Sequence, residues 1–115
     1  MTASDNLNQQ QFMPLAEFKK TYSGDYDVPI TRVESEIRSN WRAHKAGDSY
    51  EEPHPREVEH GGAVPYLNHL ERDVRRNGLQ KPVLIRNENI VENGNHRAAV
   101  ILRLGIDPVP VEHVR

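Results

Sequence analysis

The residues best suited to chemistry lie near the end of the chain, where a short apolar stretch, Ile90-Val91, meets the polar segment Glu92-Asn-Gly-Asn-His-Arg97. An apolar run follows at once, so we expect this segment to be a turn that opens into a helix. A helix N-terminus carries unpaired N–H groups and a positive charge of about half a unit, which attract anions. Gly94 allows a ligand to approach the backbone, and Arg97 adds a planar cation with several donors. These features together predict a phosphate site.

Three other side chains of this turn have more than one plausible role. His96 either fills the start of the helix, contacts phosphate or moves a proton, since the ordinary pKa of histidine lies near neutrality. Asn95 is a good helix cap, and capping is compatible with phosphate contact. Glu92 is either a solvated turn residue or a ligand for Mg²⁺. The sequence leaves these alternatives open.

The composition indicates one globular domain and excludes several classes of chemistry. The chain has 115 residues, of which 36% are hydrophobic and 28% charged. Its formal net charge of −2 argues against strong non-specific binding of nucleic acid, because such binding needs many contacts between cations and phosphates. It has no cysteine, which excludes disulfides, thiolate metal sites and a catalytic thiol.

No apolar run approaches the length of a membrane span, and the first residues lack the basic-then-apolar pattern of a signal peptide. We therefore expect a cytoplasmic protein that does not contact the membrane. The oligomeric state stays open, and a dimer is compatible with the sequence.

The second half of the chain has clear helix and strand signals on both sides of the turn. Leu67, Leu70 and Val74 have helical spacing, and Asn77-Gly78 is a typical helix end. The run Ala98 to Leu102 is apolar almost all round, which is typical of a buried helix. The expected elements are a helix at 65–77, strands at 82–85 and 90–91, a helix at 96–104 and a strand at 109–114.

The first half has weaker signals. We expect a polar N-terminal extension at 1–27, with a short helix from Pro14 on, and a domain over 28–115 that begins with a strand at Val28–Val33. Within this domain, residues 34–62 are expected to form an irregular insertion or lid. Its parts are a helix over Glu36–His44 and a loop over Gly47–Gly62, and loops of that length are often functional.

The order of these elements resembles the ParB/sulfiredoxin-like superfamily, specifically its stand-alone ParB-like N-terminal (ParB-like nuclease) domains of phages and mobile elements. The segment Leu70-Glu-Arg-Asp-Val-Arg-Arg-Asn-Gly-Leu-Gln-Lys-Pro-Val-Leu-Ile85 is similar to the family's helix, glycine cap and following strand. Gly94-Asn-His-Arg97 is similar to its glycine-x-x-arginine signature. Leu104-Gly-Ile-Asp-Pro-Val-Pro-Val111 is similar to its closing strand. The resemblance implies an α+β fold, with a mixed sheet of a few strands packed against helices.

The resemblance also implies a nucleotide ligand, ATP or CTP, with Mg²⁺ neutralising its phosphates. It places four residues around the phosphates: Gly94, Asn95, His96 and Arg97. It places four more near the sugar or base: Leu79, Gln80, Lys81 and Pro82. Kinase-like relatives carry an acidic catalytic group after the first strand, which makes Glu36 a catalytic candidate beside His96, with Glu34 as its near neighbour.

One departure from the family pattern excludes an activity. Sulfiredoxins place their catalytic cysteine immediately before the histidine of the motif, and Asn95 stands there in this chain. Reductase chemistry is therefore not expected. The remaining candidate activities are hydrolysis of a nucleoside triphosphate, phosphoryl transfer and cleavage of DNA.

A second hypothesis is a ParB-like module without catalysis that binds DNA or a host protein and modulates it. His69, Arg72 and Arg76 fall on one face of the helix expected at 65–77 and are the candidate surface for such a partner. A stripe of charges on a helix is also typical of its solvated side. If the gene belongs to a phage, the compartment is the cytoplasm of the host.

Overall fold

The structure is a computed structural model, and it describes residues 10–48, 52–92 and 95–114. In these residues, one layer is a four-stranded mixed sheet with the order β1-β4-β2-β3. β4 lies parallel to β2 and antiparallel to β1, and β2 pairs with β3 antiparallel. Parallel neighbours need a long crossover, which α5 supplies between β3 and β4. The strands are β1 (Gln10–Met13), β2 (Val83–Arg86), β3 (Ile90–Val91) and β4 (Val109–His113).

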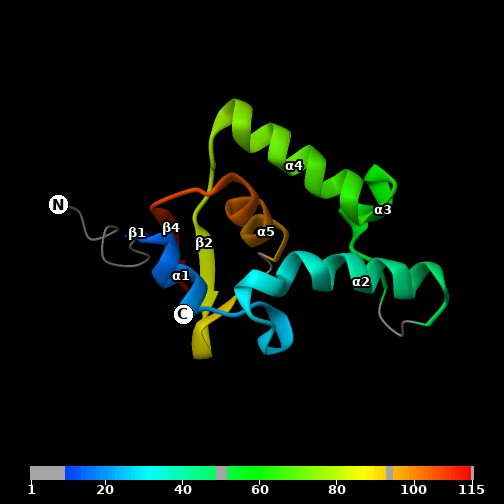
Figure 1. Ribbon diagram of the computed structural model, residues 1–115, viewed down its shortest axis with the longest axis horizontal. Coiled ribbons are helices and arrows are strands. Elements are labelled where there is room, and N and C mark those ends of the chain that lie inside the picture. Colours follow the sequence, from blue (N-terminus) through cyan, green and yellow to red (C-terminus); the bar gives the residue numbers. More distant parts are fainter. Residues whose placement is uncertain (1–9, 49–51, 93–94, 115) are drawn as a thin grey trace.

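Five α-helices accompany the sheet in the described residues. Figure 1 shows α5 at the centre, with β2 on one side of it and α4 and α2 around the rest. The short α3 contacts the start of α4, at the far end of the molecule from the sheet. The helices are α1 (Leu15–Thr21), α2 (Val33–Lys45), α3 (Pro55–His60), α4 (Ala63–Asn77) and α5 (Asn95–Leu104).

The core lies where α5 meets the sheet. In α5, four consecutive residues from Ala98 to Ile101 are buried, as the apolar run predicted. In the strands, burial alternates as a half-buried sheet requires, with Val83 and Ile85 buried in β2 and Val109 and Val111 buried in β4. Leu67 of α4 is buried as well. The expected α+β class is confirmed.

The N-terminal segment belongs to the same sheet and core. β1 is an edge strand beside β4, and the short helix expected after Pro14 is present as α1. Its Phe18 is fully buried, and Tyr22, just after the helix, is 4% exposed. Residues 10–22 therefore stabilise the sheet on which the later elements pack.

The strand expected at Val28–Val33 is wrong. Ile30–Arg32 forms a 3₁₀ turn that leads directly into α2. Ile30 and Val33, three residues apart, are both buried, which is the spacing of a helical turn rather than of a strand. Pro29 fixes its own φ before this turn and offers no N–H for a strand ladder.

The region 34–62 is more regular than expected. The helix expected at Glu36–His44 is present as α2, whereas the irregular loop expected at Gly47–Gly62 is wrong because it contains α3. Pro55 occupies the first helical position, and the His54 side chain caps the helix by accepting from the N–H of Arg56 at 3.1 Å. Gly61 ends it with a left-handed φ of 86°.

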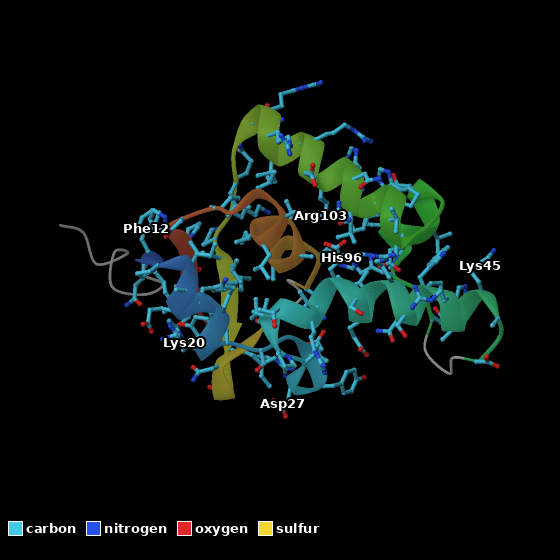
Figure 2. The ribbon with its side chains drawn as sticks, viewed as in Figure 1. Phe12, Lys20, Asp27, Lys45, His96 and Arg103 are labelled. Carbon is cyan, nitrogen blue, oxygen red and sulfur yellow. The ribbon has the colours of Figure 1, made fainter. Side chains whose placement is uncertain are left out.

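Arg103 joins the three longest helices. Its guanidinium donates to both carboxylate oxygens of Glu34 in α2, at 2.7 and 2.8 Å. It also donates to Asn68 at 3.0 Å and to Glu71 at 3.4 Å, both in α4. Figure 2 shows Arg103 beside α5, on the side of that helix that faces α4. This network fixes α5 against α2 and α4, and so fixes the position of the helix start at the site.

Candidate functional site

The start of α5 is held by the turn that precedes α2. Asn95 is the first residue of the helix, its Oδ1 accepts from the N–H of Asp25, and its Nδ2 donates to the Asp25 carboxylate, both at 3.4 Å. Gly24 permits this approach, because a Cβ there would lie 2.7 Å from Asn95 Oδ1. Gly94 lies outside the described residues. The Asn95 side chain thus anchors the helix start.

A cavity of about 250 Å³ lies between the α4–β2 connection and the first turn of α5. We call it the basic cavity because Lys81 and Arg97 both line it. Gly78 ends α4 with φ 77°, and the residues that follow pass along the cavity before β2 begins. The structure therefore brings together two segments that the sequence analysis assigned to one ligand. Its lining includes Tyr66, Leu79, Gln80, Lys81, His96 and Arg97.

Arg97 connects these two segments directly. Its Nη1 donates to the carbonyl oxygen of Pro82 at 3.1 Å. No carboxylate within the described ranges forms an ion pair with it. Burial lowers the pKa of the Arg97 guanidinium from its ordinary value, against a smaller opposing effect of Tyr66. A half-buried arginine without a counter-ion is a favourable place for an anion.

Lys81 and Asp73 set the charge around Arg97. Lys81 is exposed at the edge of the basic cavity and adds a second cation. Asp73 also lines the cavity, but its carboxylate accepts a hydrogen bond from Asn77 at 2.8 Å. The two cations exceed the single carboxylate, which leaves the cavity net positive.

His96 forms the shortest polar contact of the site. Its Nε2 lies 2.5 Å from Oε2 of Glu57 in α3. The Glu57 side chain is 8% exposed and that of His96 17%. Burial lowers the pKa of His96, while the hydrogen bond and the charge of Glu57 raise it and nearby His54 lowers it. The net direction is downward, so the imidazole is mostly neutral near pH 7.

Aromatic rings surround the His96 imidazole. The ring centroids of His54 and Tyr66 each lie 4.9 Å from that of His96. His54 and Tyr66 stack on each other at 5.8 Å, and His60 stacks on Tyr66 from the other end of α3 at 5.3 Å. Burial raises the pKa of Tyr66. Figure 2 shows His96 in the region where α2 approaches the junction of α3 and α4.

A second cavity, of about 300 Å³, lies on the other side of His96. We call it the acidic cavity, because three carboxylates line it: Asp25, Glu52 and Glu57. Trp41 and His44 of α2 contribute an aromatic wall. His54 and His96 line both cavities and form the boundary between them.

The other candidates from the sequence lie elsewhere. Glu36 is exposed in the first turn of α2 and lines a separate hollow with Tyr26 and Arg32, so the structure does not bring it to His96. Its neighbour Glu34 is engaged by Arg103, whose hydrogen bonds lower the pKa of that carboxyl. His69, Arg72 and Arg76 are all exposed along α4, as expected.

The metal assignment receives no support from geometry. Glu92 is half-buried after β3, and its N–H donates to the carbonyl of Leu84 at 2.8 Å. Within residues 10–48, 52–92 and 95–114, no three His, Asp or Glu side chains gather in a way that could hold a metal ion. The described residues thus do not form a binding site for Mg²⁺ on their own.

Sequence reasoning missed Glu57 as the partner of His96 and Tyr66 as its neighbour. Glu57 lies 39 positions before His96 in the chain, and nothing in the local spacing links them. The available signals were the proline and glycine that bound α3, since a short helix there presents Glu57 on its buried side.

Comparison of the chain with family models, with curated proteins and with solved structures gives no match in any of the three. Among the described residues, no helix is both long and apolar enough to cross a membrane.

Proposed function

We propose that this chain is a ParB/sulfiredoxin-like domain that binds a nucleoside triphosphate, ATP or CTP, with its phosphates in the basic cavity. The observation that carries the proposal is the single cavity shared by Leu79, Gln80 and Lys81 on one side and His96 and Arg97 on the other. The family resemblance assigns these two segments to one nucleotide.

The electrostatics of the cavity support an anionic ligand. Arg97 is half-buried and has no carboxylate partner in the described ranges, so a phosphate would supply the missing counter-charge. Lys81 adds a point charge at the rim. Arg97 lies in the first turn of α5, and Lys81 lines the same cavity, so the positive end of the helix adds to the attraction for an anion there.

The order of elements supports the family assignment. The segment from α4 through Gly78 into β2, then β3, α5 and β4, follows the motifs on which the resemblance depends. Mg²⁺ would accompany the phosphates of the nucleotide, since the described residues offer no cage of their own. A cytoplasmic location belongs to the same proposal.

The proposal is tested by calorimetric titration of the purified chain with ATP, CTP and GTP, each with and without Mg²⁺. We expect saturable binding of at least one triphosphate, and weaker binding of the matching nucleoside, which lacks the phosphates. Absence of binding by all three nucleotides would overturn the proposal.

A partner-binding module without catalysis is the second candidate. The observation in its favour is the exposed face of α4, where His69, Arg72 and Arg76 are all open to solvent. DNA or an acidic host protein would fit this charge. The paired change Arg72→Glu and Arg76→Glu should then abolish retention on a duplex DNA column or on the partner, while leaving nucleotide titrations unchanged.

A further inference from the structure

Glu57 is the only charged residue that is buried in the described part of the chain, and the single hydrogen-bond partner of its carboxylate there is His96. Burying a carboxylate is costly unless it is paired and hydrogen-bonded. His96 itself stands between two cavities, beside the cations of the basic one. A histidine oriented by a buried carboxylate is the usual arrangement of a general base.

We propose that Glu57 and His96 form a carboxylate–histidine pair that activates water for hydrolysis of the triphosphate bound in the basic cavity. This inference rests on the proposed function and adds the reaction to it. His96 is the residue that takes the proton, and Glu57 is a positioning residue that acts through His96.

The geometry defines the roles of the two ring nitrogens. Nε2 faces the Glu57 carboxylate at 2.5 Å. Because a carboxylate only accepts hydrogen bonds, the neutral imidazole carries its proton on Nε2 and donates it there. The neutral ring then carries its lone pair on Nδ1, and no group in the described ranges hydrogen-bonds to that atom. Nδ1 is therefore the atom that can accept a proton from water.

Hydrolysis of the bound triphosphate needs no reactant other than water. The oxygen of water forms a bond to the terminal phosphorus, and the bond from that phosphorus to its bridging oxygen breaks. The bridging oxygen leaves as an oxygen of the nucleoside diphosphate, and the water proton passes to Nδ1 of His96 and then to solvent. Arg97 and Lys81 would stabilise the charge on the phosphoryl oxygens.

Several groups around His96 decide its protonation. Glu57 from α3 favours the imidazolium, whereas burial and His54 disfavour it. Tyr66 from α4 contacts the ring, and Arg97 is the residue that follows His96 in α5. Because the pKa of His96 is lowered overall, the ring is available as a base at neutral pH.

The test compares Glu57→Gln with the wild-type chain and with Glu59→Gln, which changes an exposed carboxylate of the same helix. Nucleotide affinity is measured by calorimetry, and phosphate release is followed from pH 5 to 9. We expect Glu57→Gln to keep nucleotide affinity within about twofold and to lose on the order of tenfold to a hundredfold in kcat, part of what a positioned base contributes. We expect Glu59→Gln to match the wild type.

The pH profile separates positioning from a structural role. Hydrolysis should rise as His96 loses its proton, and removal of the Glu57 charge should move this rise to lower pH. Glu57→Asp keeps the charge and should recover part of kcat, and ring ¹⁵N shifts of His96 should show a proton on Nε2 in the wild type.

Two failures are distinguishable. No nucleotide binding by the wild type contradicts the proposed function and the inference together. Binding without hydrolysis, equal kcat and equal profiles in Glu57→Gln, or a proton on Nδ1 contradicts the inference alone. His96→Gln, which leaves Glu57 unchanged, must also lose phosphate release if Glu57→Gln proves unstable.

Discussion

Arg97 donates a hydrogen bond to the carbonyl oxygen of Pro82 at 3.1 Å, and this contact joins the first turn of α5 to the residue that precedes β2. The two positions are 15 residues apart in the chain. The bond uses one Nη1 donor of the guanidinium, and further donors remain for a ligand in the basic cavity. The function proposed here depends on that guanidinium.

Replacement of Arg97 by glutamine should weaken nucleotide binding strongly. Hydrogen bonds to charged groups contribute about 1.5–3 kcal/mol, so we expect the Kd for the triphosphate to rise by about tenfold to a hundredfold. Arg76→Gln, on the exposed face of α4, is the matched control and should bind like the wild type. Equal affinities of Arg97→Gln and the wild type in calorimetry would remove Arg97 from the site.

Lys81 should contribute less than Arg97, because its ammonium is exposed at the rim and screened by salt. We expect Lys81→Gln to weaken binding by about 1.5-fold to fivefold at low ionic strength, which corresponds to the contribution of an exposed charge pair. The difference from the wild type should shrink at high salt. Lys45→Gln, at the exposed end of α2, serves as the control, and a salt-independent difference would contradict this role.

The Arg103–Glu34 pair should stabilise the fold in a pH-dependent way. The hydrogen bonds from Arg103 lower the pKa of Glu34 below its unfolded value. Its contribution is therefore complete above the unfolded pKa of about 4.3 and is lost as the pH falls through the depressed value. Urea titrations should show that Glu34→Gln loses about 1–2 kcal/mol at pH 7, and less as the pH falls below 4. A constant difference between pH 3 and 7 would contradict the pairing.

A substitution at Ile101 tests whether α5 is the central helix of the core. Its side chain is fully buried between the sheet and the helices. Ile101→Ala removes three carbon atoms and leaves a cavity, so we expect a loss of about 2–5 kcal/mol in the free energy of unfolding. The exposed Val64→Ala in α4 should cost far less. Similar losses for both variants in chemical denaturation would show that α5 is not the core helix.

The sequence predicted the second half of the fold well because its signals are local. Leu67, Leu70 and Val74 have the period of a helix, and Gly78 marks its end, as α4 shows. The run Ala98–Leu102 predicted a helix buried on several sides, and α5 is that helix. Such patterns predict a helix reliably because the spacing of its buried residues does not depend on which other element it packs against.

The first half was harder because its local patterns are ambiguous. Val28–Val33 contains β-branched residues that favour a strand, yet packing of Ile30 and Val33 in the core selects a helical turn. The pairing of Glu57 with His96 depends on how α3 docks against α5. No spacing in the chain encodes that contact. The sequence therefore pointed to His96 as a candidate base, but not to Glu57 as the residue that positions it.

The most direct measurement is a crystal structure of the chain with a non-hydrolysable triphosphate analogue. We expect phosphate oxygens within hydrogen-bond distance, about 2.7–3.2 Å, of the Arg97 guanidinium and the Lys81 ammonium. The base or sugar should lie against Leu79 and Gln80. A nucleotide bound elsewhere, or a basic cavity that stays free of the analogue at saturating concentration, would contradict phosphate binding in the basic cavity.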